Sequence, residues 1–332
     1  MLDTDIRLEW FVSFLAVVET GSFVSAAEST RRSQPRVSQH VAALEREIGQ
    51  PLFDRKKRPV QLTEAGGALA VQARNVLRAL ERAESAMAPW RGGTRGIVSL
   101  GSYPSASAAF VPGLLQSLAV SDPDIKVVLT EHATLELDEA LAAGGIDLYL
   151  RPMTPKPTSP SVVSRPLWAE PLVVVHAEDH PLSDVPDPVP MSVVAEHPIV
   201  VIGRLDAPET AEFESFRVFQ EHGLTISPVQ ATNQPQTLVS LVAHGIGVGV
   251  TNWLAAWSAD TKGVRVRPLE GAPRRRVAVC WDSTRALTPA ARRILQAVTE
   301  APRPAGTLPT RTQNAPVSEE QGVGTWPYSL SE

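Results

Sequence analysis

A short run of polar and basic residues, at positions 31–39, combines side chains that can hydrogen-bond to nucleic acid. Gln34 and Gln39 carry amides that can pair with adenine, and Ser38 can reach either a base or a phosphate. Arg36 would stand in the first turn of a helix, where a cation opposes the helix dipole. Its presence there indicates that its partner is an external anion or a guanine edge. These residue types predict a helix that reads DNA.

The helix that would carry them is predicted from Ser33, as N-cap, to Ile48, with Gly49 as its C-terminal stop. Pro35 is tolerated in the first turn, where backbone N–H groups lack helical partners. An apolar stripe at spacings of four, three and four should pack on two preceding helices, the second of them at about 23–30. The stripe consists of Val37, Val41, Leu44 and Ile48.

A second basic run, residues 54–59, lies between the short extended pieces 51–53 and 60–62, as a wing would. Positions 31–61 hold eight Lys or Arg against three acids, although the whole chain has a net charge of −5. A nucleic-acid surface must therefore be local, and this segment has the charge that DNA binding requires. The alternative is a small helical domain with a solvated charged face. The candidate DNA-binding residues are Arg31, Ser33, Gln34, Pro35, Arg36, Ser38, Gln39, Arg55, Lys56, Lys57 and Arg58.

A long helix is predicted from Thr63, a suitable N-cap, to about Ala88. Its apolar residues alternate spacings of three and four over about three heptads. Such a seam can pair two chains and so present two recognition helices to two half-sites. The alternative is a helix packed on its own domain. The seam comprises Gly66, Leu69, Ala73, Val76, Leu80, Ala83 and Met87, of which Leu69, Val76, Leu80 and Met87 are the candidate dimerisation residues.

From about Gly96, apolar strand patterns alternate with helical ones, which predicts a parallel α/β architecture of two subdomains. Ligands bind in the crevice of such sheets, at the carboxyl ends of the strands. Polar residues follow several of the predicted strands, and their types favour a small, anionic effector. The alternative is that they are ordinary loop residues. The candidate effector-binding residues are Ser102, Tyr103, Ser105, Arg151, Arg204 and Asn233.

Composition argues against several other kinds of site. Cys280 is the only cysteine, which excludes an intramolecular disulfide, and it is expected to be a buried structural thiol. The seven histidines lack metal-ligand spacing, so we expect neither a metal nor a cofactor. We find no run of about 18 apolar residues and no secretory signal, which predicts a cytoplasmic protein without a membrane partner. Residues 301–332 hold five prolines and are predicted to be a disordered tail.

Two other functions compete with DNA-binding regulation. An enzyme or a transport-type binding protein could use the α/β portion alone. However, we find no nucleophile elbow, P-loop or metal cluster in the sequence, so we do not expect an enzyme. A periplasmic binding protein would need a signal peptide, and we find none. An architectural DNA-binding protein without an effector is the third interpretation, and the large crevice-forming domain argues against it.

The first 66 residues resemble the N-terminal domain of LysR-type transcriptional regulators, in order and in spacing over roughly 60 residues. A weaker resemblance to the effector domain of that family extends to about residue 300. It includes Leu172-Val173-Val174-Val175 followed by His180-Pro181-Leu182, and Gly245-Ile246-Gly247-Val248. The N-terminal resemblance rests on Gly21-Ser22-Phe23, Ala26-Ala27-Glu28, Ser33-Gln34-Pro35, Ser38, Leu44-Glu45, Gly49, Leu52-Phe53, Arg55 and Leu62-Thr63-Glu64-Ala65-Gly66.

This resemblance implies an α+β multidomain fold. It would consist of a winged helix-turn-helix DNA-binding domain at 1–62, a linker and dimerisation helix at 63–92, and a C-terminal α/β effector domain, similar to periplasmic binding proteins, at 93–300. The effector domain would divide into subdomain I, about 93–165 and 269–300, and subdomain II, about 166–268. Residues 301–332 would form the tail.

The resemblance also implies a tetramer, commonly a dimer of dimers, on partly palindromic double-stranded promoter DNA. Activation or repression would be controlled by a small-molecule effector, with RNA polymerase as a further partner. Gln34, Pro35 and Ser38 match recognition-helix positions, and Arg55 matches the wing. The chain departs from the family pattern where apolar residues are usual, at Thr30 and Arg32, and where basic residues are frequent, at Gln39 and Ala42. These departures concern the operator preference rather than DNA binding.

Overall fold

The structure is a computed structural model, and it describes residues 5–54, 56–86, 95–205 and 212–310. Contacts group the chain into two compact units whose main boundary in sequence lies at Gly96, and each unit is described by itself. Within the described residues, no single helix is long and apolar enough to cross a membrane. A bent pair, Leu8–Thr20 and Phe23–Ser29, meets that test only when its two short helices are joined, and both contribute to the core of the first unit.

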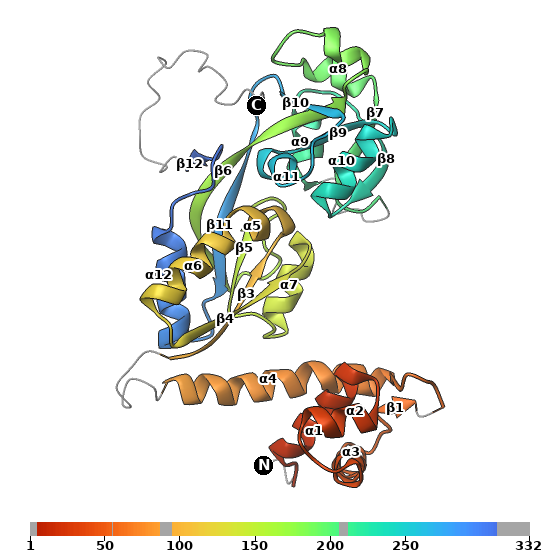
Figure 1. Cartoon of the computed structure of the whole chain (residues 1–332), viewed down its shortest axis with the longest axis vertical. Helices are drawn as coiled ribbons and strands as arrows, with labels where there is room; N and C mark the ends of the chain where they lie inside the picture. The colour runs from red at the N-terminus through yellow and green to blue at the C-terminus, as the bar shows by residue number, and fades with distance from the viewer. Residues whose placement is uncertain (1–4, 55, 87–94, 206–211, 311–332) are drawn as a thin grey trace. The chain divides into compact units, whose positions relative to one another are not determined.

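The N-terminal unit is a winged helix-turn-helix, as predicted (Figure 1). Strands β1 and β2 pair antiparallel and form the two sides of the wing. Side chains from all four helices form one core, and Phe14, Val41 and Leu44 are fully buried in it. The elements are α1 (Leu8–Thr20), α2 (Phe23–Ser29), α3 (Gln34–Ile48), β1 (Phe53–Asp54), β2 (Gln61–Leu62) and α4 (Glu64–Ala86).

Local signals fix the ends of these helices. Gly21 and Gly49 end α1 and α3 in the left-handed conformation. Thr63 Oγ1 accepts a hydrogen bond from the Gly66 N–H at 3.0 Å, so Thr63 caps α4 as expected. Ser33 is the N-cap residue of α3, but its side chain makes no capping hydrogen bond.

Helix α4 packs on its own unit from its first turn as far as Leu77. This packed part includes Gly66, Leu69 and Ala73. In the second half of the helix, Val76 and Leu80 are 41% and 43% exposed. The predicted dimer seam is therefore divided: Leu69 belongs to the core of the unit, whereas Val76 and Leu80 remain open to a partner. Met87 lies outside the described residues.

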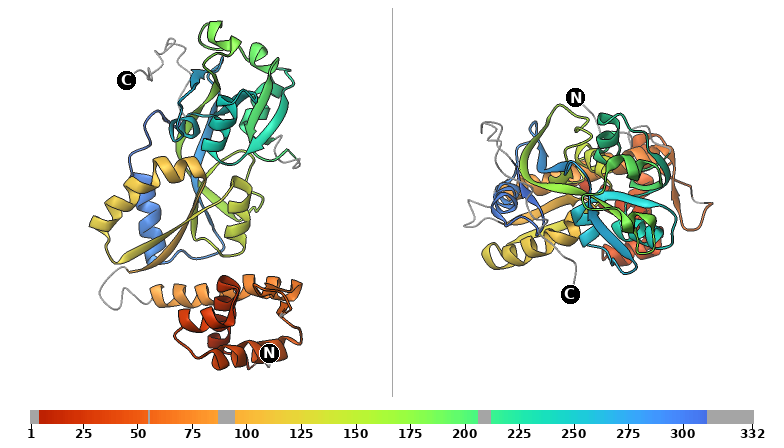
Figure 2. Two further views of the ribbon diagram at one scale, coloured as in Figure 1. Left: turned by 45° about the vertical axis from the view of Figure 1, so that its right-hand side comes forward. Right: turned by 90° about the horizontal axis from the view of Figure 1, so that it is seen from above.

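The second unit consists of two α/β lobes built on one mixed sheet (Figures 1 and 2). In the first lobe, α6 and α12 lie together on one side of the strands and α7 lies on the other. The elements of this lobe are β3 (Gly96–Ser102), α5 (Pro104–Ala109), α6 (Val111–Ser121), β4 (Ile125–Glu131), α7 (Thr134–Ala142), β5 (Leu148–Pro152) and α12 (Pro289–Glu300). Strands β3 and β5 pair parallel, as the alternating pattern predicts.

The second lobe has its own parallel strands, with β7 between β8 and β9. Its core includes Val174, Ile199, Phe219 and Val248. The elements are the 3₁₀ helix η2 (Pro181–Asp184), α8 (Met191–Ala195), β7 (Pro198–Ile202), α9 (Glu214–Glu221), β8 (Ser227–Thr232), α10 (Pro235–Ala243), β9 (Val248–Asn252), α11 (Trp253–Trp257) and β10 (Val264–Pro268).

Two long antiparallel strands, β6 (Val162–Ala177) and β11 (Arg274–Asp282), connect the lobes (Figure 1). Strand β6 pairs with β11 over its first part and with β9 and β10 over its last part. Strand β6 therefore takes part in the sheet of both lobes, and the connection between them consists of sheet.

The chain after α12 corrects one prediction. Residues 301–310 are not a disordered tail, because β12 (Leu308–Pro309) pairs with Ala169 and Trp168 of β6. Thr307 is buried, and its hydroxyl donates to the Pro304 carbonyl at 2.7 Å. The rest of the predicted tail, 311–332, lies outside the described residues.

Candidate functional site

The outer face of α3 presents the polar residues predicted from the sequence. Gln34, Pro35, Arg36 and Gln39 are exposed, and Ser38 is half-buried. The Gln34 amide donates to Ser38 Oγ at 3.2 Å, so the two side chains lie together on one surface. The opposite stripe is buried at its first three positions, whereas Ile48 is 36% exposed. Arg31 and Ser33, which precede the helix, are also exposed.

Arg36 has a partner within the chain, contrary to the expectation that only an external group would explain it. Its Nη2 atom lies 3.2 Å from Glu9 Oε2, and both side chains are accessible to solvent. A carboxylate near the first turn of α3 also offsets the unfavourable position of the cation. Because exposed ion pairs contribute little, Arg36 can exchange Glu9 for a phosphate or a base.

A buried polar network, which sequence reasoning missed, fastens α3 to α1. Ser13 Oγ lies 2.8 Å from Nδ1 of His40. Arg32 donates to Ser13 Oγ at 2.7 Å and to the Glu9 carbonyl at 3.1 Å. Burial lowers the pKa of His40, and Arg32 and Arg36 lower it further against the opposing effect of Glu9. Arg32, a departure from the family pattern, therefore positions the recognition helix.

The wing carries the predicted basic residues on its surface. Lys56, Lys57 and Arg58 are exposed, and Lys57 Nζ donates to Gln61 Oε1 at 2.9 Å. Arg55 lies outside the described residues. The Val60 N–H donates to the Gly21 carbonyl at 3.0 Å, which ties the wing to the turn between α1 and α2. The exposed amides of α3 and the cations of the wing belong to one folded unit.

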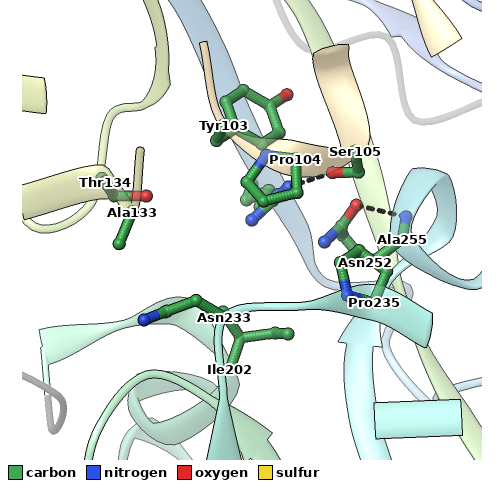
Figure 3. Close-up of a pocket in the computed structure, with 11 residues that line it drawn as sticks. Tyr103, Pro104, Ser105, Ala133, Thr134, Ile202, Asn233, Pro235, Asn252 and Ala255 are labelled. Carbon is green, nitrogen blue, oxygen red and sulfur yellow. Dashed lines mark hydrogen bonds between the residues drawn. The ribbon is translucent and has the colours of Figure 1, made fainter. Parts of the chain in front are cut away.

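In the second unit, a pocket of about 330 Å³ opens between the two lobes (Figure 3). Tyr103, Pro104 and Ser105 border it from the first lobe, and Asn233 and Asn252 face them from the second. Three predicted effector-binding residues, Tyr103, Ser105 and Asn233, are thus brought together. The remaining lining residues are Ala133, Thr134, Ile202, Pro235, Ala255 and Arg275.

The other three predicted residues do not line this pocket. The prediction that Arg151 binds the effector is wrong. Its side chain is fully buried, forms an ion pair with Asp138 and donates to the Pro152 carbonyl at 2.8 Å. Ser102 is fully buried, and its hydroxyl donates to the Tyr103 carbonyl. Arg204 is exposed, is not among the lining residues, and has a partner elsewhere in the chain. Being near a strand end therefore does not bring these side chains to the pocket.

Sequence reasoning missed Arg275, which lines the pocket, and its fully buried partner Glu170. Arg275 Nε donates to Glu170 Oε2 at 2.6 Å, and the guanidinium carbon lies 5.0 Å from the Tyr103 ring centroid. Glu170 Oε1 also accepts from the Tyr103 hydroxyl at 2.5 Å and from Trp168 Nε1 at 2.9 Å. Burial and Glu170 raise the pKa of Tyr103, so its hydroxyl stays a donor.

A strand pattern could have indicated Arg275. In the run Arg274-Arg275-Arg276, the outer two are exposed and the middle one is buried, as alternation along a strand requires. A second pocket, of about 260 Å³, shares Ile202, Asn252 and Arg275 with the first. Cys280 lies fully buried in the same strand, and burial raises the pKa of its thiol to about 12, as befits a structural thiol.

Two family models match the chain. The one described as "LysR substrate binding domain" covers residues 91–303, and "Bacterial regulatory helix-turn-helix protein, lysR family" covers residues 8–67. The chain is 33% identical over 253 residues to the nitrogen assimilation regulatory protein nac of Klebsiella aerogenes, which spans 76% of this chain and 79% of that protein. It is 31% identical over 235 residues to the HTH-type transcriptional regulator CatR of Pseudomonas putida, with 71% and 78% covered.

Solved structures of full-length regulators have the same fold. Full-length CbnR in complex with its target DNA gives a TM-score of 0.68 at 20% identity, over 88% of this chain and 98% of that one. A full-length OxyR variant from Pseudomonas aeruginosa gives 0.62 at 24% identity, over 89% and 97%. At these identities the structural likeness shows only the fold, whereas the family models and the sequence relatives show the family. The chain therefore belongs to the LysR family of DNA-binding transcriptional regulators.

Proposed function

We propose that this regulator binds promoter DNA through α3 and the wing, and that a small effector with an anionic group controls it from the pocket between the lobes. The observation that carries the DNA part is the exposed set of amides and cations on α3, beside a basic wing, in a chain of net negative charge. Amides and guanidinium groups read base edges, and the wing cations bind phosphates.

The direct test is selection of genomic fragments by the purified full-length protein, followed by gel shifts over a salt series. We expect enrichment of partly palindromic sites and a specific affinity about 10³-fold or more above the non-specific one. Equal retention of all fragments at every salt concentration would contradict sequence-specific regulation.

The effector part of the proposal is supported by the geometry of the pocket. Side chains at the starts of α5 and α10, Ser105 and Asn233 among them, border it from opposite lobes. First-turn N–H groups and the Arg275 guanidinium favour a negative group there. A thermal-shift screen of the full chain against small carboxylates and phosphates tests this, since a ligand at 100-fold its Kd adds about 2.7 kcal/mol of stability.

We also propose that the chain pairs through the open part of α4, and that two such dimers form a tetramer on two half-sites. Val76 and Leu80 are apolar and exposed on a helix whose earlier turns are packed, which is consistent with a partner. Such a protein would act in the cytoplasm, where promoter DNA and RNA polymerase are available to it. Light scattering of the full chain gives its mass in solution directly.

A further inference from the structure

The second pocket contains a buried carboxyl group with an unused hydrogen-bonding position. Glu214, the first residue of α9, lines this pocket, and its Oε1 atom is buried without a hydrogen-bond partner. The carboxyl has a hydrogen bond with the backbone of Glu214 itself and another with the Thr154 side chain of the first lobe. A buried carboxylate oxygen without a hydrogen-bond partner is unfavourable, so we expect this oxygen to accept a hydrogen bond from a bound ligand.

A second acceptor with the same property lies in the same pocket. Thr251 is buried, and its Oγ1 atom also has no hydrogen-bond partner. The neighbouring Asn252 is already engaged, because its Oδ1 accepts from the Ala255 N–H at 3.0 Å. Glu214 Oε1 and Thr251 Oγ1 are therefore two buried oxygens with free acceptor positions on the walls of one cavity, and the Thr251 hydroxyl can also donate.

The count of buried charges points to the kind of group that these acceptors would bind. Arg275 is paired with Glu170 at 2.6 Å, and both act electrostatically on Glu214. The two pockets have no other charged side chain among their described lining residues. Two carboxyl groups thus lie near one guanidinium, so a positively charged group of a ligand beside Glu214 would stabilise that carboxyl in its ionised form.

We propose that the effector carries a protonated amine, which Glu214 and Thr251 bind, so that it is a small zwitterion of the amino-acid type. This rests on the proposed effector function of the cleft, since the anionic group would lie in the adjoining pocket near Arg275. An ammonium group has three donors and no acceptor, which matches the free acceptors better than a second anionic group does. A neutral hydroxyl of the ligand could donate to one of these acceptors, but it would leave the Glu214 carboxylate without an opposite charge.

The environment of the carboxyl gives this proposal a pH signature. Burial raises the pKa of Glu214, Arg275 and the Thr154 hydrogen bond oppose that shift, and Glu170 adds to it. Because an ammonium ligand requires the ionised carboxylate, acid pH should weaken amine binding by protonating Glu214. A Glu214→Gln protein lacks that component of the pH dependence.

The test uses the full chain and pairs of probes that differ only in the amine. Amino acids are compared with the acids in which hydrogen replaces the amino group, for example alanine with propanoate and aspartate with butanedioate. We expect at least one amino acid to raise the Tm and to bind at least about tenfold tighter than its deaminated partner. In Glu214→Gln and in Thr251→Val this preference should be reduced, whereas Glu221→Gln, at the exposed end of the same helix, should retain it.

The outcomes separate the two proposals. Binding of deaminated acids as tight as that of amino acids, unchanged in Glu214→Gln, overturns the amine proposal and leaves the effector function standing. Absence of any Tm shift in both series overturns both. Should Glu214→Gln fail to fold, Thr251→Val decides the matter alone, because it removes only a hydroxyl. An amine preference that Thr251→Val leaves intact would then count against the site.

Discussion

Arg36 already has an anionic partner, and DNA binding must compete with it. The Glu9 carboxylate lies 3.2 Å from the guanidinium in a solvent-exposed pair. Exchange of one exposed anion for another costs little free energy, whereas a guanine edge or a phosphate offers shorter, better oriented hydrogen bonds. The pair with Glu9 is therefore compatible with the proposed contact between Arg36 and DNA.

Substitution of Arg36 and of Lys57 should separate base reading from phosphate binding. Arg36→Ala is expected to weaken binding to the selected operator by about 1–3 kcal/mol and to relax base preference. Lys57→Ala should weaken binding to all sequences about equally and lower the salt slope by roughly one ion. Gel-shift titrations over a salt series measure both effects, with Arg217→Ala of the other unit as control. Unchanged affinity in both variants would overturn the assignment of this surface.

The buried His40 gives the N-terminal unit a predicted acid sensitivity. Its pKa is lowered by burial, so the folded state binds a proton less readily than the unfolded state, whose histidine pKa is about 6.5. As pH falls through that value, the unfolded state gains protons first, and the free energy of unfolding decreases. The protection factors of the α1 and α3 amides, which correct exchange rates for intrinsic chemistry, should therefore fall from about pH 7.5 to about pH 5.5, on either side of the histidine pKa of about 6.5.

A His40→Gln protein is the control for this effect. Glutamine can still hydrogen-bond to Ser13 but does not titrate, so its exchange rates, corrected for intrinsic chemistry, should depend less on pH. Equal pH dependence of the two proteins would show that another group causes the acid sensitivity.

At the scale of the element, α4 presents both buried and exposed apolar residues along one helix. Its early residues, such as Ala73, pack in the core, and its later apolar residues, Val76 and Leu80, are exposed. We expect Val76→Lys with Leu80→Lys to lower the measured mass toward that of a monomer while the unit stays folded. Sedimentation measures the mass and circular dichroism the fold. Ala73→Lys is the contrasting variant, because a buried charge should unfold the unit.

How far the elements could be predicted depends on how local their signals are. The helices of the first unit follow from apolar spacing and caps, such as Thr63 before α4, which act within a few residues. Strand β6 has a local apolar signal only in its second half, because polar residues such as Ser164 and Arg165, which are exposed, occupy its first half. Its true length depends on pairing with β11, more than a hundred residues away in the chain.

The same reasoning explains which parts of the pocket were predictable. Tyr103, Ser105 and Asn233 flank helices that follow strands, so the strand-end rule finds them. That rule does not say which way a side chain turns, and Arg151 turns into the lobe toward Asp138. Arg275 joins Glu170 across 105 positions of sequence, a contact that no local pattern contains.

At the scale of the whole second unit, the segment after α12 adds a second connection between the strand β6 and the second lobe, beside the direct packing of α11 on β6. Strand β12 pairs with β6 beside Trp168, whose indole donates to Glu170. Two residues earlier, Gly306 has φ +75° and lies against Trp253, the first residue of α11 in the second lobe. The segment thus contacts both the connecting strand and a helix of the second lobe.

A methyl group at position 306 should release this segment. A Cβ there would lie 2.0 Å from Trp253 Nε1, and a positive φ is strained for alanine. We expect Gly306→Ala to lower the free energy of unfolding of the effector unit by about 1–3 kcal/mol and to speed hydrogen exchange of β6 near Trp168. Gly113→Ala in α6 is the matched control, because nothing lies within 4 Å of its added Cβ. If both variants behave alike, the contact of Gly306 with Trp253 does not restrain β6; if only Gly306→Ala speeds exchange in β6, the segment holds the connecting strand in place.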